Sequence, residues 1–193
     1  MDSLLEMVFL GYRVKRPWEP GPSWAPIERV CCVGENLSEP PEGWIDRWDL
    51  NRAACYPTPG EAWATVHEDR VPFRLFAYDF LPVYFEKGEP PEVVSLDEIF
   101  ENGFSDIPGG RPNLDDMAGI GYDIAEWFSI NWPNSPLVNN GFAREFAANR
   151  YGLLDLFETA IEACGEINKA MPKHHAANWI LRVHAKGVEG PLF

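Results

Sequence analysis

The sequence has few basic residues for its size. Its 193 residues include 16 Lys and Arg against 30 Asp and Glu, which gives a formal net charge of −14 at pH 7. A field of that sign repels phosphate backbones and anionic lipid, so neither a nucleic acid nor a membrane is expected as a partner. The complementary partner is a basic protein, although acidity also serves solubility on its own.

The sequence also lacks any long apolar segment. No apolar run approaches the ~18 residues that a membrane-spanning helix requires. The N-terminal residues 1–6 carry acids in place of the basic region that opens a signal peptide. From these two absences we expect a cytoplasmic protein.

Cysteine is scarce, with four residues at Cys31, Cys32, Cys55 and Cys164. No CxxC pair exists, so neither a zinc site nor a disulfide framework is predicted. All four lie in or beside apolar runs, which favours buried thiols that behave as small hydrophobes. A nucleophilic role for Cys31 or Cys32 would need a nearby base, and the apolar run at residues 30–33 supplies none.

Recognisable catalytic and cofactor-binding motifs are missing too. The sequence has no Gly-rich phosphate loop, nucleophile elbow, HExxH or EF-hand pattern. The one histidine pair, His174 and His175, is adjacent in sequence, and adjacent side chains usually diverge instead of binding one metal ion. Asp115 and Asp116 could form an acid/base pair, but neighbouring acids in a Pro/Gly-rich loop are more often solvated. We predict no catalytic residue, no metal and no cofactor.

The chain does contain the material for a folded core. It is 46% hydrophobic and 13% aromatic, with eight Trp and twelve Phe. Disordered chains lack that apolar content, so a packed interior is expected. The eighteen prolines fall mostly between the apolar runs, which indicates long ordered loops.

The most informative feature is an internal repeat. Residues 43–52 align without a gap on residues 141–150, and a glycine, two aromatic positions and an Asn-Arg pair keep their places. Upstream, residues 10–14 resemble residues 120–124. Downstream, each copy enters a predicted helix and then a strand that ends in Lys-Gly. Matches in the same order along the chain indicate a duplication.

The duplication predicts an α+β fold of two tandem, pseudo-symmetric β-loop-α-β units, with a mainly antiparallel sheet and helices packed on it. The first unit spans residues 1–88 and the second spans residues 117–193. An acidic, Pro/Gly-rich connector at residues 89–116 separates them. The Asn-Arg pairs are expected to form the turn that leads into each helix, because Asn holds such turns easily.

Strands are predicted where aromatic and branched residues concentrate, at residues 7–14, 29–33, 74–85, 120–130 and 179–184. Pro82 interrupts the third of these, so that strand should lie at an edge or bend there. Each unit also has one helix: Thr58 and Glu61 form a capping box in the first, and Asp155 is the predicted cap of the second. Apolar residues then recur at helical spacing, in the first helix at Ala62, Trp63 and Val66 and in the second at Phe157, Ala160, Ile161, Cys164 and Ile167. The opposite, solvated face of the second helix is predicted from Glu158, Glu162 and Glu166.

The connector concentrates acidity, with eight acids and one base. Ser95 and Glu98 form a capping box that predicts a short helix at residues 96–102. Because a preorganised acidic segment suits a basic partner, we predict partner-binding acids at Asp97, Glu98, Glu101, Asp106, Asp115 and Asp116. Trp is a common interface anchor, so Trp44 and Trp132, in loop-like stretches, complete the predicted interface. The alternative is a solvated connector that only spaces the two units.

In its size, acidity, aromatic content and lack of recognisable chemistry, the chain resembles bacterial immunity proteins that neutralise toxins. We therefore predict an acidic cytoplasmic protein-binding module that inhibits or neutralises a basic protein partner, such as a toxin or effector. The alternative is a small-molecule enzyme or ligand-binding protein with a pocket at the seam between the two units. A nucleic-acid mimic ranks below both, because the acids outside the connector are interleaved with bases.

Overall fold

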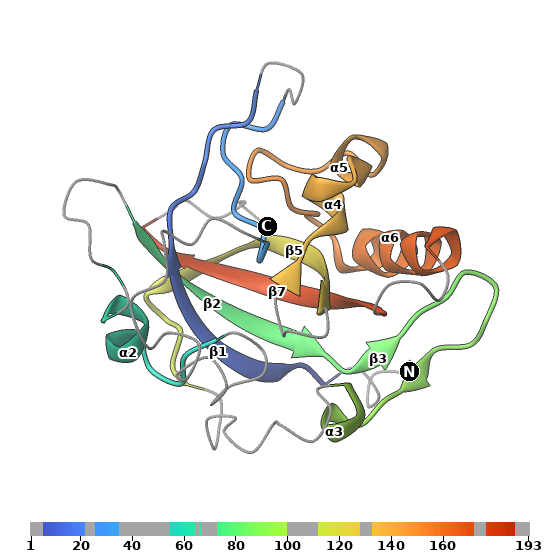
Figure 1. Cartoon of the computed structure of the whole chain (residues 1–193), viewed down its shortest axis with the longest axis horizontal. Helices are drawn as coiled ribbons and strands as arrows, with labels where there is room; N and C mark the ends of the chain where they lie inside the picture. Colours follow the sequence, from blue (N-terminus) through green and yellow to red (C-terminus); the bar gives the residue numbers. More distant parts are fainter. Residues whose placement is uncertain are drawn as a thin grey trace.

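The computed structural model describes residues 6–21, 26–34, 55–64, 66, 73–99, 112–127, 133–171 and 177–187. Within these ranges, five strands form one curled antiparallel sheet in the order β1-β2-β7-β5-β6 (Figure 1). The strand bounds are β1 Val8–Lys15, β2 Arg74–Leu81, β5 Met117–Trp127, β6 Pro133–Asn134 and β7 Asn178–Lys186. A separate hairpin pairs β3, Val83–Tyr84, with β4, Glu92–Val93. The mixed α+β class predicted from the sequence is confirmed.

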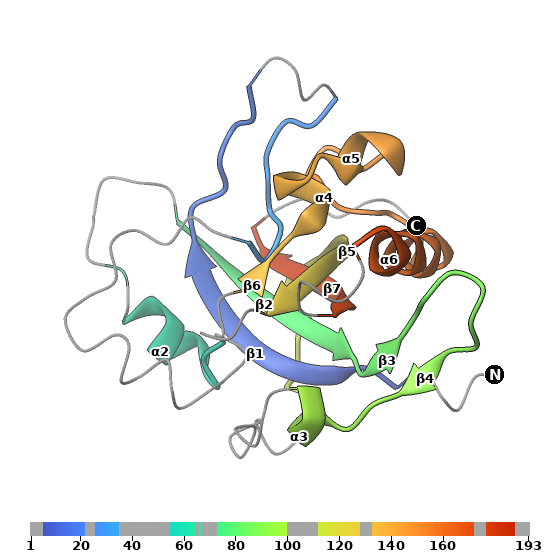
Figure 2. The ribbon, with the colours of Figure 1, turned by 45° about the vertical axis from the view of Figure 1, so that its right-hand side comes forward.

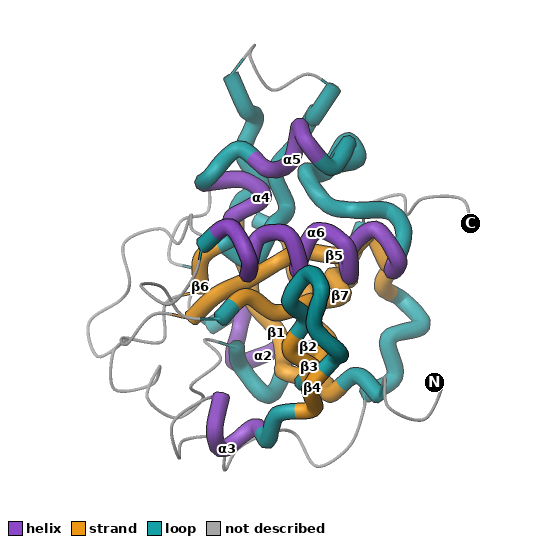
Figure 3. The backbone as a smooth tube through the Cα atoms, turned by 90° about the vertical axis from the view of Figure 1, so that its right-hand side faces the viewer, coloured by secondary structure: helices purple, strands orange, loops and turns teal. Residues whose placement is uncertain are grey.

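The described helices are α2 Pro59–Trp63, α3 Leu96–Ile99, α4 Pro136–Asn139, α5 Phe142–Glu145 and α6 Phe157–Ala170. The longest, α6, runs beside β5 and β7, and the turn of the β3–β4 hairpin lies alongside it (Figure 3). The short helix α2 packs at the other end of the sheet, against β1 and β2 (Figure 1). No helix in the described part of the chain has the length and apolar character needed to cross a membrane.

The main core lies on both sides of the central strands. Alternate residues of β2, Phe76, Tyr78 and Phe80, are fully buried on one face, together with Leu181 and Val183 of β7. Apolar side chains from the loops and from α6 complete this cluster. Burying these large aromatic side chains supplies much of the folding free energy, at roughly 25 cal/mol per Å² of apolar surface removed from water.

Buried charges hold the loop at residues 31–34 against that sheet. Arg13 Nη1 donates a hydrogen bond to the Val33 carbonyl at 2.6 Å, and Lys15 Nζ donates to the Gly34 carbonyl at 3.1 Å. The Val33 amide donates to Asp123 Oδ2 at 2.6 Å. These side chains are almost completely buried, so each needs such partners to offset the loss of hydration.

The strand predicted at residues 29–33 is therefore wrong. Only Val30 forms a β-bridge, to Trp18, while the Cys31 amide donates to the Tyr151 carbonyl at 3.0 Å. The apolar pattern did indicate burial correctly. The backbone groups of this segment form hydrogen bonds with side chains and with a turn distant in sequence, and not with a neighbouring strand. The local sequence does not show which of these partners the backbone will have.

Local signals predicted other boundaries well. The capping box at Thr58 and Glu61 is confirmed, with both reciprocal hydrogen bonds present. Pro82 separates β2 from β3, as expected for a residue that cannot donate to the ladder. The connector helix α3 begins at Leu96 as predicted, and Ser95 Oγ accepts a hydrogen bond from the Glu98 amide. The predicted end of that helix lies outside the described residues.

Two predictions about helices are wrong. Asp155 does not cap α6: the cap position is Leu156, with no side-chain cap bond, and Asp155 Oδ1 instead accepts a hydrogen bond from Asn149 Nδ2 at 2.7 Å. The carboxylate thus accepts a hydrogen bond from a side chain six residues upstream, in the loop before the helix, and does not accept one from an amide of the first turn. In α2, Ala62 is buried but Trp63 is 44% exposed, so Trp63 does not belong to the buried face that the helical spacing predicted.

Candidate functional site

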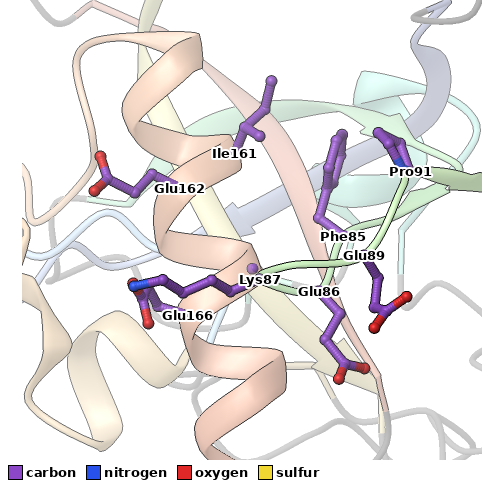
Figure 4. Close-up of a pocket in the computed structure, with 9 residues that line it drawn as sticks. Phe85, Glu86, Lys87, Glu89, Pro91, Ile161, Glu162 and Glu166 are labelled. Carbon is purple, nitrogen blue, oxygen red and sulfur yellow. The ribbon is translucent and has the colours of Figure 1, made fainter.

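A pocket of about 350 Å³ lies between the β3–β4 hairpin and the middle of α6. We call it the α6 groove. Its lining residues come from segments far apart in the sequence: Phe85, Glu86, Lys87, Glu89, Pro91, Ile161, Glu162, Gly165 and Glu166 (Figure 4). The volume is at the lower end of the range for ligand pockets, roughly 300–1,000 Å³, so the space suits one or two side chains of a partner.

Hydrogen bonds fix the two walls of the groove to each other. The Lys87 amide donates to the Gly165 carbonyl at 3.1 Å. Asn168, which is buried, donates from Nδ2 to the Phe85 carbonyl at 2.7 Å. Lys169 Nζ reaches the Lys87 carbonyl at 3.3 Å. The hairpin is thus attached to the C-terminal half of α6, and the groove is preformed.

The floor of the groove is apolar. Phe85 is buried, Ile161 is half-buried and Pro91 is exposed. Figure 4 shows Phe85, Ile161 and Pro91 on the same side of the opening, with Glu86 and Glu89 directed away from them on the hairpin. A long side chain with an apolar stem and a charged end could therefore cover the carbon surface and extend towards these carboxylates.

The charge of the groove is negative. Four of its lining residues are glutamates and one is a lysine, which gives four negative charges against one positive. Lys87 Nζ forms an exposed ion pair with Glu166 across the groove (Figure 4). The hydrogen bond and the charge of Glu166 raise the pKa of Lys87. Glu86, Glu89 and Glu162 are left to attract an external cation.

The Glu86 carboxylate is also held in place by a hydrogen bond from within the hairpin. The Tyr84 hydroxyl donates a hydrogen bond to Glu86 Oε2 at 3.0 Å. Burial, followed by the hydrogen bond and charge of Glu86, raises the pKa of Tyr84 to about 12. The phenol therefore stays protonated at neutral pH and remains a donor to this carboxylate.

The acids predicted from the connector fall in two separate places. Asp97 and Glu98 are exposed on α3, which follows β4 and lies below the hairpin in Figure 2. Asp115 accepts a local hydrogen bond from Asn113, whereas Asp116 forms an exposed ion pair with Lys186 at 2.6 Å. That hydrogen bond and charge lower the pKa of Asp116.

These two places are at opposite ends of the sheet. The Val94 amide, just before α3, bonds to the Pro82 carbonyl after the last residue of β2, whereas Lys186 lies level with the first residues of β2. A strand of eight residues spans roughly 25 Å. Asp97 and Glu98 therefore share an end of the molecule with the α6 groove. The other predicted interface residues, Glu101, Asp106, Trp44 and Trp132, lie outside the described residues.

The seam between the two predicted units is the pairing of β2 with β7. On one face of this seam, His184 Nε2 lies 2.9 Å from Asp79 Oδ2. A paired His and Asp is a common catalytic arrangement. However, Asp79 is 1% exposed and His184 is 5% exposed, so a substrate cannot reach the pair in this conformation. Neither residue lines the α6 groove, which lies between the β3–β4 hairpin and α6.

The cysteines have the properties of packed core residues. All four are buried and free. Burial raises the pKa of Cys31 to about 11 and that of Cys32 to about 12, so both thiols stay protonated and weakly nucleophilic at neutral pH. Within the described ranges, no three His, Cys, Asp or Glu side chains are grouped to hold a metal ion. The pair His174 and His175 lies outside those ranges.

Sequence reasoning missed the α6 groove although it noticed its parts. The sequence predicts a solvated helix face at Glu158, Glu162 and Glu166. It identifies Lys87 only as the end of a strand. The spacing of the glutamates was the available signal, because three like charges on one helical face are unfavourable without a compensating role. Comparison of the chain with protein-family models, with curated proteins and with solved structures gives no match.

Proposed function

We propose that this chain is an acidic protein-binding module that inhibits or neutralises a basic protein partner, in the way that immunity proteins neutralise toxins. The observation that best supports the proposal is the α6 groove, where an apolar floor is bordered by four glutamates and a single lysine. Protein interfaces commonly combine an apolar centre with a charged rim. In a chain of net charge −14, this geometry favours a basic partner.

The proposed inhibition is steric and electrostatic. A toxin or effector that acts on a polyanion or an anionic surface carries basic residues at its working face. Carboxylates that pair with those residues would cover that face without any chemistry on this chain. Asp97 and Glu98 extend the acidic surface beyond the groove, so we include them in the proposed interface. The proposed compartment is the cytoplasm.

We further propose that the chain is a tandem duplication with unit boundaries at residues 88 and 117. Three features support it. Strand β1 and strand β5 each carry a bulge at a glycine with positive φ, Gly11 and Gly121. The next residues, Tyr12 and Tyr122, each form a bridge to a residue just upstream of a helix. In the order β1-β2-β7-β5, the strands of one proposed unit mirror those of the other.

The alternative function, a small-molecule enzyme or ligand-binding protein with a pocket at the seam, has one observation in its favour. The hydrogen-bonded Asp79 and His184 lie at the β2–β7 pairing. Their burial makes a structural role in the sheet the better explanation, so we rank this function second.

The proposal is tested by identifying the partner and measuring its activity. The purified chain is immobilised and used to capture proteins from the native host at low and at physiological salt. We expect one basic protein in an equimolar complex, and we expect its purified activity to fall to background when one equivalent of the chain is added. Recovery of no protein at physiological salt, or a partner whose activity is unchanged in the complex, would overturn the proposal.

A further inference from the structure

We propose that the α6 groove binds a lysine or arginine next to an apolar residue of the partner, and that Lys87 occupies the place of that cation in the free chain. This inference rests on the proposed function and specifies the part of the partner that is recognised. The occupant is a basic, amphipathic segment of a protein. The argument uses the shape of the groove, its charge and the position of the Lys87–Glu166 ion pair.

The shape selects an amphipathic occupant. Lysine and arginine side chains pack their aliphatic stems on apolar surface while the charged end stays in contact with water or carboxylates. Phe85, Ile161 and Pro91 supply such a surface, and Glu86 and Glu89 belong to the same pocket lining, with their carboxylates directed away from it (Figure 4). A second, apolar side chain can use the remaining floor. A purely polar cation would leave that floor exposed to water.

The charge selects a cation. After Lys87 and Glu166 have neutralised each other, three lining carboxylates remain, at Glu86, Glu89 and Glu162. This local excess of negative charge attracts a cation, which can form a new ion pair with one of the remaining carboxylates. An acidic or neutral segment gains no such pair.

Lys87 is well placed to act as a substitute for the external cation. Its side chain is 60% exposed and that of Glu166 is 34% exposed, and exposed ion pairs of this kind are weak and exchange easily. The Lys87 backbone stays fixed by its hydrogen bond to Gly165, so the side chain can leave without moving the hairpin. A partner cation that pairs with Glu166 must displace the Lys87 amine or share that carboxylate with it.

The test is a titration followed by NMR and by calorimetry. The probe is an eight-residue peptide of alternating lysine and leucine. Comparison ligands are the alternating lysine–serine peptide, the alternating glutamate–leucine peptide and spermidine. We expect the lysine–leucine peptide to bind, with amide shifts confined to the hairpin and α6, and the three comparison ligands to bind at least ten-fold more weakly. The double variant Glu86→Gln/Glu89→Gln should weaken peptide binding several-fold.

Lys87→Ala is the decisive variant, because removing the internal competitor should tighten binding several-fold. Its matched control is Lys186→Ala, which removes one lysine from the other exposed ion pair, with Asp116, at the far end of the sheet. Both variants make the net charge more negative by the same amount, so only a local effect separates them. Equal affinities for the two variants would overturn the proposed role of Lys87.

Other outcomes overturn the proposed occupant. If spermidine or the lysine–serine peptide binds as tightly as the lysine–leucine peptide, an apolar residue of the partner has no part in recognition. If the amide shifts lie away from α6, the groove is not the site. A captured partner that binds normally to the Glu86→Gln/Glu89→Gln variant refutes the groove but leaves the proposed function standing. Peptide binding in the groove without any captured partner refutes the function alone.

Discussion

At the scale of single residues, Asp123 shows two opposing influences on one carboxyl group. The side chain is fully buried on β5, and burial raises its pKa to about 6. Hydrogen bonds from Ser135 Oγ and from the Val33 amide, both at 2.6 Å, act in the opposite direction by stabilising the charged form. Lys15 adds a buried cation nearby, and burial lowers the pKa of that lysine.

The raised pKa of Asp123 predicts a pH dependence of stability. A carboxyl with a higher pKa in the folded state binds its proton more tightly when folded. Its stabilising contribution is therefore complete below about pH 4 and is lost as the pH rises through about 6. A shift from 3.8 to about 6 corresponds to roughly 3 kcal/mol. Relative to Asp123→Asn, the wild type should gain about that much stability between neutral pH and about pH 4, measured by urea unfolding.

The sign of the stability change with pH shows whether burial or hydrogen bonding dominates the pKa of Asp123. If the hydrogen bonds dominated over burial, the wild type would lose stability relative to Asp123→Asn as the pH falls, and the assignment would be wrong. The variant Ser135→Ala provides a second test of this assignment. Since it removes one donor to the carboxylate, the pH midpoint of the stability change should move upward.

At the scale of elements, β1 and β5 depend on a glycine at the same structural position. Gly11 has φ +134° and Gly121 has φ +138°, values that side-chain-bearing residues rarely adopt. A Cβ on Gly11 would lie 2.5 Å from the Tyr56 carbonyl oxygen, and one on Gly121 would lie 2.9 Å from the Leu154 carbonyl oxygen. Each of those carbonyls accepts the hydrogen bond of a β-bridge, so it cannot move aside freely.

Gly11→Ala and Gly121→Ala should each lower the free energy of unfolding by at least about 2 kcal/mol, through backbone strain and steric overlap. Chemical denaturation measures both. The matched control is Gly60→Ala in α2, where a Cβ meets no atom within 4 Å and alanine favours the helix. Tolerance of one substitution and not the other would count against the proposed duplication, since equivalent bulges should respond alike.

At the scale of the whole molecule, the placement of the acids decides which of them can meet the partner. Asp97 and Glu98 lie at the end of the sheet that carries the α6 groove, whereas Asp115 and Asp116 lie at the other end. The chain therefore contains two acid pairs of equal charge in different places. Long-range attraction to a basic partner would act on both pairs, but in the proposed interface only Asp97 and Glu98 make contact.

We expect Asp97→Asn/Glu98→Gln to slow association with the captured partner several-fold at low salt. Asp115→Asn/Asp116→Asn, with the same change in net charge, should have a smaller effect. The difference should shrink as salt screens the charges, and stopped-flow measurements at two ionic strengths would record it. Equal slowing would place the interface away from the groove. If neither pair matters, the connector acts as a spacer.

The sequence alone determined the features that depend on neighbours within one helical turn or one strand. Three such features are the capping box at Thr58, the strand interruption at Pro82 and the apolar stripe of α6. Each follows from interactions between residues a few positions apart. The cysteines were also predicted correctly as buried, because an apolar run has no other stable environment.

Tertiary structure alone decided the features that join distant segments. The Val33 amide meets Asp123 90 residues away, which removes a predicted strand, and Lys87 meets Glu166 79 residues away, which completes the α6 groove. The Val33–Asp123 and Lys87–Glu166 contacts exist only because the packing of the sheet and helices brings segments far apart in the sequence together.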